Sequence, residues 1–323
     1  MPDIIAQAQA LDGLTRDLAR LGTPLSWLLV AAALALLATA LFPAFDPWRR
    51  KTLAATVALL AVGEALLVWF HVRLYDVAVV ADPASGRVTG HVAVPLWVES
   101  EKLYVWALVL GVMLLAAKRH AEEVFPIAAS ILALLVLGAV LWGRPFTEPL
   151  PQFMAQYRSY LQAPAMNPDP NAIYAAFQGM EASRQYYYNT WYMWVHPPML
   201  FFSYGAFAMS FAGTLLMLRH KRQSFEETAY RWARLGYLPL TFGMLLGFPW
   251  AILAWSGESW WWSGKVNMSI MMWLLYTAYL HCRLYLRKRG MWKVVGALGV
   301  LSFVVLVLTY LATYVVPGAH SYA

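Results

Sequence analysis

Long apolar stretches separated by short polar segments dominate this chain from residue 25 onward. Eight of these stretches are close to the ~20 residues that an α-helix needs to cross a bilayer. They cover about residues 25–44, 52–72, 102–117, 124–142, 197–218, 235–255, 266–286 and 294–316. The pattern therefore predicts an all-α, polytopic membrane bundle of about eight transmembrane helices.

The remaining segments carry weaker patterns. Residues 4–22 place Leu11, Leu14 and Leu18 at helical spacing among polar residues, which predicts a helix lying along the membrane surface. The alternative is a core-facing or disordered leader. Residues 73–100 alternate apolar and polar positions around a Pro-Ala-Ser-Gly turn, which predicts a small hairpin. The chain thus divides into an amphipathic leader (1–24), a four-helix half (25–142), an aromatic-rich loop (143–196) and a second membrane half (197–323).

The aromatic-rich loop contains a proline-rich turn at 164–170 and an aromatic run at 186–194 that leads into His196. Proline is tolerated in the first turn of a helix. We therefore expect the fifth transmembrane helix to open at His196, with Pro197 and Pro198 in its first turn. The aromatic run is typical of a pocket wall and equally of an interfacial belt.

Charge placement predicts the orientation of the chain. Of its 24 lysines and arginines, 15 lie in four short segments, 45–51, 118–123, 219–234 and 283–293. The positive-inside rule places these segments in the cytoplasm, and both termini, the long loops and the leader outside. The net charge of +7 is explained by this distribution and does not indicate nucleic-acid binding. Cys282 is the only cysteine, so the chain has no intrachain disulfide and no CxxCH motif for covalent haem.

A tryptophan-rich loop at 255–265 joins the sixth and seventh apolar stretches. It contains Trp255, Trp260, Trp261, Trp262 and Lys265. Indole rings favour the membrane interface, so one interpretation is an aromatic belt that anchors helix ends. The alternative is a stacking platform for a flat apolar ligand, since the rings crowd into about one turn.

Three histidines are candidate metal ligands. His196 and His320 lie at the outer ends of the fifth and eighth stretches and flank the tryptophan loop, which is the arrangement of an axial pair for haem iron. His281 follows Lys265 by 16 residues and so lies in the cytoplasmic half of the seventh stretch, where an ionisable residue indicates function. The alternative is a side chain that extends towards Arg283 and the cytoplasmic interface. We expect the partner ligand of His281 to come from another subunit, because the chain has no second intramembrane histidine at its depth.

His71 and Glu64 form a further candidate site. Glu64 lies two helical turns below His71 on the same face of the second stretch, amid apolar residues where a carboxylate is costly to bury. This pair fits a proton path, a quinol site, an additional haem site or a structural pairing with another helix. The remaining histidines, His91, His120 and His220, lie in polar loops and are interpreted as solvated surface.

The second membrane half resembles the CcsA/CcmC/CcmF haem-handling proteins of cytochrome c maturation, and the predicted layout is most like CcsA. The family's tryptophan-rich (WWD) loop reads WGxYWxWDPKE and leads into a helix ending in Tyr-Leu-His. Here residues 257–266 occupy that place and lead into Tyr279-Leu280-His281. The segments 195–207 and 318–322 are similar to the motifs around the family's two outer histidines.

This resemblance implies a protein of the bacterial cytoplasmic (inner) membrane that binds haem b non-covalently. His196 and His320 would be the outer axial ligands, Trp260 and Trp262 part of the platform, and His281 one ligand of a transmembrane haem. Implied partners are a CcsB-like membrane subunit and, outside, apocytochrome c or a multihaem cytochrome, within a cytochrome c haem lyase or synthase. Ser263, Gly264 and Val266 replace the family's Asp, Pro and Glu, so two acidic groups are missing from the loop.

Three functional interpretations remain open. The first is delivery of haem b to an apocytochrome CxxCH motif outside the membrane. The second is a haem b-containing electron-transfer subunit linked to quinol, which the missing acidic groups and the outer position of Glu64 and His71 favour. The third is a degenerate homologue acting as a scaffold, although all three motif histidines are retained.

Overall fold

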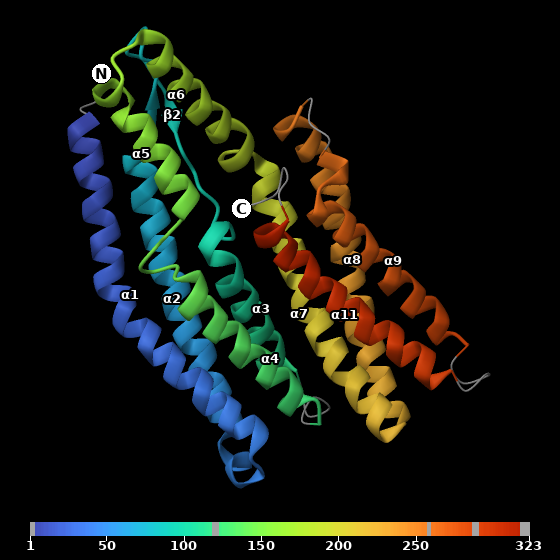
Figure 1. Ribbon diagram of the computed structural model, residues 1–323. Helices are drawn as coiled ribbons and strands as arrows, with labels where there is room; N and C mark the ends of the chain where they lie inside the picture. Colours follow the sequence, from blue (N-terminus) through green and yellow to red (C-terminus); the bar gives the residue numbers. More distant parts are fainter. Residues whose placement is uncertain (1–3, 118–122, 257–259, 286–290, 317–323) are drawn as a thin grey trace. The chain divides into compact units, whose positions relative to one another are not determined.

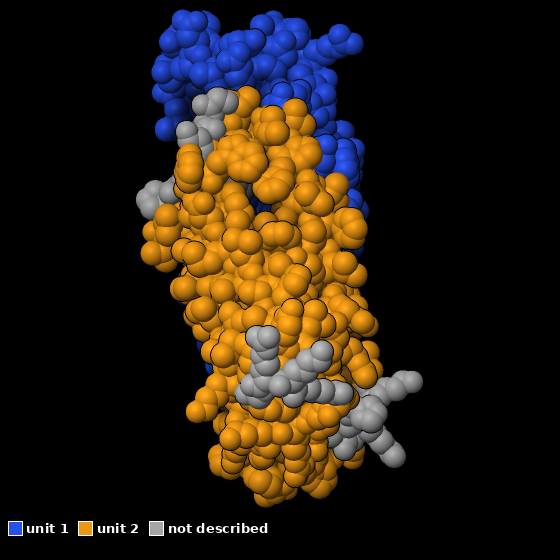
Figure 2. All heavy atoms as spheres, turned by 90° about the vertical axis from the view of Figure 1, so that its right-hand side faces the viewer, with its two compact units in different colours: residues 1–35, 55–108, 134–195 blue, residues 36–54, 109–133, 196–323 orange. Residues whose placement is uncertain are grey.

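The computed structural model describes residues 4–117, 123–256, 260–285 and 291–316 (Figure 1). It separates into two compact units, which Figure 2 shows in different colours. Unit 1 comprises Met1–Ala35, Ala55–Leu108 and Leu134–Val195, and unit 2 comprises Leu36–Ala54, Val109–Ala133 and His196–Ala323. One boundary between the units lies between Val195 and His196.

Helices make up nearly all of the described chain. They are α1 (Ile4–Leu41), η1 (Pro43–Trp48), α2 (Arg49–Val77), η2 (Glu99–Glu101), α3 (Lys102–Ala116), α4 (Phe125–Gly138), η4 (Ala139–Gly143), α5 (Pro151–Met166), α6 (Pro170–Ala182), η5 (Ser183–Tyr188), α7 (Trp191–His220), α8 (Gln223–Ala254), η6 (Trp260–Trp262), α9 (Gly264–Arg283) and α11 (Trp292–Val315). Within the described ranges, six helical segments are long and apolar enough to span a membrane: α1, η1 with α2, α4 with η4, α7, α8 and α11. The other two predicted spans form α3, which has only 15 residues, and α9. The all-α, polytopic membrane bundle is confirmed.

The leader is helical, as expected, but it is continuous with the first apolar stretch in α1, which passes through Pro24 without a break. Its leucines at 11, 14 and 18 are buried inside unit 1. A carboxylate oxygen of Asp12 accepts a hydrogen bond from Arg158 of α5 at 2.8 Å. Gly22 lets Phe146 approach so closely that a Cβ would lie 2.3 Å from the Phe146 Cβ. The leader therefore packs as part of unit 1.

The predicted hairpin is confirmed in the strands β1 (Val79–Ala81) and β2 (Val88–His91), which are antiparallel with Val80 opposite Gly90. Figure 1 shows the hairpin at the same end of unit 1 as α6 and the start of α1. The outer edge of β1 is occupied by tyrosines of α5: the Tyr157 hydroxyl accepts from Val79 N and donates to Val79 O, at 2.8 and 2.9 Å. Tyr160 bonds Ala81 in the same way, at 2.8 and 2.9 Å.

The chain beyond β2 is held in a similar manner by Asn189. Its side-chain oxygen accepts from Ala93 N, and its side-chain nitrogen donates to His91 O, both at 2.8 Å. An amide side chain thus makes the pair of bonds that a neighbouring strand would make. Side chains from the segment 143–196 therefore bond the outer edges of this two-stranded sheet.

The start of α7 corrects a prediction made from the sequence. The helix begins at Trp191 rather than at His196, so Pro197 and Pro198 lie inside it. Proline has no N–H, so Pro197 leaves the carbonyl of Met193 without its helical donor. The indole N–H of Trp97 donates to that carbonyl instead. The Trp97 and Trp194 rings also meet edge to face, 5.7 Å apart, which holds the first turns of α7.

Unit 2 is held by close helix approach and by a buried ion pair. A Cβ at Gly213 of α7 would lie 3.0 Å from Ala229 N of α8, so glycine permits the contact there. Helices α9 and α11 pack along each other (Figure 1). At the far end of α9, Arg283 pairs with Glu226 of α8 through two nitrogens and lies 4.1 Å from the centre of the Tyr230 ring.

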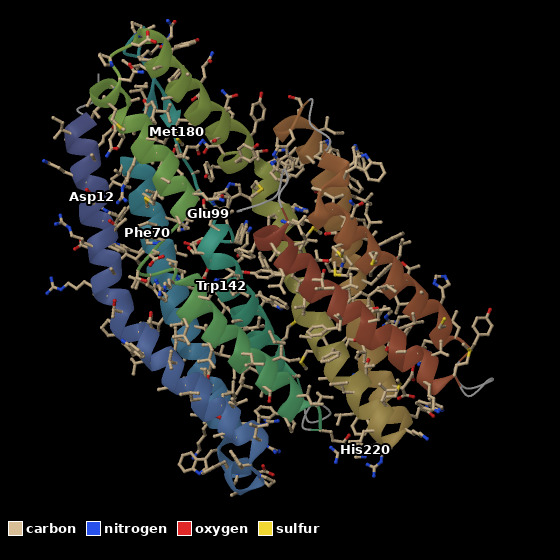
Figure 3. All side chains as sticks on the ribbon, viewed as in Figure 1. Asp12, Phe70, Glu99, Trp142, Met180 and His220 are labelled. Atoms are coloured by element: carbon tan, nitrogen blue, oxygen red, sulfur yellow. The ribbon has the colours of Figure 1, made fainter. Side chains whose placement is uncertain are left out.

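Glu99 caps helix α5 from outside it. Leu150, which precedes α5, offers no side-chain cap, and the Glu99 carboxylate accepts from Gln152 N at 2.7 Å and from Phe153 N at 3.1 Å. Glu99 lies at the start of the segment that leads into α3 (Figure 3). The residue is buried, and burial raises the pKa of its carboxyl group to about 7, although the two backbone bonds oppose the shift. The first free amides of α5 thus find their acceptor in a residue 53 and 54 positions earlier in the chain.

We expect Glu99→Gln to flatten the pH dependence of thermal stability. The folded-state pKa of Glu99 is above its ordinary value of 4.5, so its stabilising contribution is present at low pH and is lost as the pH rises from about 4.5 to about 7. The loss corresponds to up to ~3 kcal/mol. Thermal unfolding in detergent at mildly acidic and mildly basic pH measures it. Glu148→Gln, at an exposed ion pair with Arg144, is the matched control; an equal pH dependence in Glu99→Gln and wild type would contradict the prediction.

Candidate functional site

His196 is positioned by two glycines and a tryptophan of α8. Its Nδ1 donates to the carbonyl oxygen of Gly243 at 2.6 Å, which fixes the proton on Nδ1 and leaves a lone pair on Nε2. Gly247 provides the space: a Cβ there would lie 2.8 Å from His196 Cε1. The Trp250 ring stacks alongside the imidazole of His196, with ring centres 6.3 Å apart and ring planes inclined by 26°. This is the tautomer and support that an imidazole ligand of a metal requires.

The four tryptophans of the loop occupy different environments. Trp255 and Trp260 are buried, whereas Trp262 is 80% exposed. Trp260 and Trp261 stack on each other with ring centres 4.0 Å apart, and Phe248 of α8 lies 5.2 Å from Trp261. The stack that can support a flat ligand is therefore built by Trp260 and Trp261, and Trp255 supports Trp250 edge to face at 4.7 Å.

The first turn of α9 lies against the end of α11. The Ser263 hydroxyl caps α9 by accepting from Val266 N, and Lys265 follows in the first turn. A Cβ at Gly264 would lie 2.8 Å from Val316, the residue after α11. His320 is only four residues further along the chain, in the segment outside the described residues. The end of the described chain is thus close to the tryptophan loop and Lys265.

His281 lies on an exposed face of α9. Its Nδ1 donates to Thr277 O at 2.8 Å, which again leaves the lone pair on Nε2. One turn earlier, the Thr277 hydroxyl meets the Tyr237 hydroxyl of α8 at 2.7 Å, and Trp273 donates to Thr241 at 2.9 Å. These bonds fix the register of α9 against α8, and they fix the position of His281.

The candidates His71 and Glu64 belong to unit 1 and acquire a third member there. His71 Nδ1 donates to Val94 O at 2.7 Å, and Nε2 lies 2.8 Å from a carboxylate oxygen of Glu101. Glu101 has no exposed surface. The rings of His71 and Phe70 meet edge to face, with ring centres 5.7 Å apart. Glu64, His71 and Glu101 are called the carboxylate–imidazole cluster below.

Sequence reasoning missed several residues that shape these sites. Glu101 and Glu99 were not singled out, although two carboxylates directly before an apolar helix are a detectable signal. Gly243, Gly247 and Trp250 were also missed. Their roles depend on how α7 packs against α8, and glycines in an apolar helix give no such indication.

Comparison with known proteins gives a consistent result. The family described as "Cytochrome C assembly protein" matches residues 96–320. The "Probable cytochrome c-type biogenesis protein NrfE" of Escherichia coli is 28% identical over 83% of this chain and 48% of that protein. "Cytochrome c biogenesis protein CcsA" of Gloeobacter violaceus is 33% identical over 36% of this chain and 33% of that protein.

A solved structure shares the fold. The structure named "Cytochrome c Heme Lyase CcmF" aligns with a TM-score of 0.55 at 23% identity, covering 93% of this chain and 48% of that one. The chain spans about half the length of the long curated relatives that it matches. The matched family region contains the tryptophan loop and each of the three candidate ligands His196, His281 and His320.

Proposed function

The chain belongs to the cytochrome C assembly protein family, and on that premise we propose that it binds haem b non-covalently and presents it to apocytochrome c outside the membrane. The observation that carries the proposal is His196, whose Nδ1–H is held by Gly243 while Nε2 keeps its lone pair. The Trp250 ring beside His196 contacts Trp255 of the tryptophan loop. Haem is the cargo in this proposal, and its addition to the CxxCH thiols is its own chemistry.

In this proposal His196 and His320 are the axial ligands of the outer haem. The contact of Gly264 with Val316 supports a position for His320 near the tryptophan loop, because only four residues separate His320 from Val316. Trp260 and Trp261 would stack on the macrocycle, with Trp255 behind them and the exposed Trp262 at the rim. Lys265 would offer a cation to a haem carboxylate.

His281 would bind the iron of a second, transmembrane haem. Its exposed position on α9 supports a ligand partner from another chain, such as a CcsB-like subunit, because a ligand facing away from its own bundle is accessible to a neighbour. The fixed Nδ1 proton leaves Nε2 for the iron, as at His196. We further propose an inner-membrane location, with the tryptophan loop facing the periplasm, from the positive-inside distribution of charge.

The quinol-linked electron-transfer alternative is not favoured by the comparisons, since the relatives named above are described as assembly and biogenesis proteins. The geometry of His71 is also unfavourable for an additional haem. Both ring nitrogens of His71 already have partners, Val94 O and Glu101, so iron ligation would break one of these bonds.

We expect His196→Ala and His320→Ala each to lose most bound haem b, and added imidazole to restore it, because a free imidazole can occupy the cavity left by the side chain. The visible spectrum and the haem stoichiometry of the purified protein, with and without dithionite, measure this. His91→Ala, at a ring stacked on Tyr75 in unit 1, is the control. Haem content unaffected by either substitution would overturn the ligand assignment.

Haem transfer provides a separate test of delivery. The wild-type protein loaded with haem should pass it to a CxxCH peptide when reduced, because exchangeable ligation suits a carrier. Transfer is followed by the absorption of the covalent product. Complete retention of haem in the presence of excess peptide would contradict delivery while leaving haem binding intact.

Gly247→Ala should weaken haem binding about tenfold, because the new Cβ displaces the imidazole of His196 and costs on the order of one hydrogen bond. A haem titration followed by absorption measures the dissociation constant. Gly13→Ala is the matched control, since no heavy atom lies within 4 Å of its added Cβ. Equal dissociation constants for Gly247→Ala and Gly13→Ala would show that His196 does not need this space.

A further inference from the structure

The carboxylate–imidazole cluster of unit 1 is unusual in its proton count. His71 Nδ1 must carry a proton, because its partner at 2.7 Å is the carbonyl oxygen of Val94, which can only accept. A single proton then lies between His71 Nε2 and Glu101, whichever of the two atoms holds it. The pair is therefore neutral overall, as an ion pair or as two neutral groups.

Glu64 adds a carboxyl group that this pair does not neutralise. Glu64 lies two helical turns before His71 on the same face of α2, and its charge interacts with both His71 and Glu101. One carboxylate oxygen of Glu64 and one of Glu101 are buried without a hydrogen-bond partner in the described part of the chain. An ionised Glu64 would leave the cluster with one net negative charge beside His71 and Glu101, which are both buried, and this is unfavourable.

The neighbouring polar groups do not supply the missing positive charge. The Tyr104 hydroxyl of α3, beside Gly63, donates to Leu60 O at 2.9 Å, and Tyr104 carries no charge. Glu99 is engaged with the first amides of α5, and the charge of Lys102 acts on Glu99. The described ion pairs of the chain include one at His71 and Glu101 and none at Glu64.

We propose that Glu64, His71 and Glu101 form a buried proton-binding site that holds one proton more than the His71–Glu101 pair, carried by Glu64 at neutral pH. The ligand of this site is a proton, exchanged with water. His71 connects the cluster to Val94, in the extended segment that follows β2, through its Nδ1–H. This site is independent of the haem ligands of unit 2.

Infrared spectroscopy of the full chain in detergent tests the proposal. Glu99 is also partly protonated near neutral pH, so the measurements are made with Glu99→Gln present in every protein compared. This parent protein at neutral pH should show the carbonyl stretch of a protonated carboxylic acid, with a shift in D2O, and Glu64→Gln should lose the band. Glu148→Gln, at an exposed carboxylate, should keep it. Absence of the band in the parent protein, or its full retention in Glu64→Gln, overturns the proposal. Loss in Glu101→Gln with retention in Glu64→Gln overturns the assignment to Glu64.

A second measurement covers the case in which Glu64→Gln does not fold. Glutamate labelled with ¹³C at the carboxyl group in the parent protein should move the same band, and Glu64→Asp should replace the labelled band with an unlabelled one. A band that does not respond to the glutamate label overturns the proposal.

Discussion

Polar groups inside an apolar layer must find their partners within the protein, and this constraint shapes the chain more than any single contact. Pro197 removes a helical donor, and Trp97 supplies a replacement to the carbonyl of Met193. Hydroxyl groups follow the same rule. Ser210 of α7 donates to Ala229 O of α8 at 2.8 Å, so a small side chain joins two helices while satisfying itself. Polar satisfaction and helix packing are thus achieved by the same residues.

The sequence pattern was sufficient for the class of fold, because a long apolar run in lipid has few alternatives to a helix. It also located the hairpin, whose alternation of polar and apolar residues is short but regular. Helix boundaries were less predictable. The start of α7 was placed at His196 because prolines favour a first turn, but Trp97, nearly 100 residues earlier, supports the helix back to Trp191. Local rules cannot anticipate such a distant donor.

In the candidate site, too, some residues are identifiable from the sequence and others are not. His196 was identifiable as a polar residue at the end of an apolar stretch, and the tryptophan loop by its composition. The residues that position His196 were not identifiable, since Gly243 contributes only a backbone carbonyl and Gly247 contributes only the absence of a side chain. Glu101 is separated from its partner His71 by 30 residues and a hairpin. Sequence reasoning therefore identifies ionisable groups more readily than the backbone that orients them.

The tyrosines of α5 and the amide of Asn189 have a consequence for how an extended polypeptide can be recognised. An unfolded client commonly binds by adding a strand to a free sheet edge, where main-chain bonds provide affinity without regard to sequence. Here Tyr157, Tyr160 and Asn189 already occupy the outward-facing groups of Val79, Ala81 and His91. The sheet is closed to augmentation at these positions, so a client reaching this hairpin would have to be recognised through its side chains.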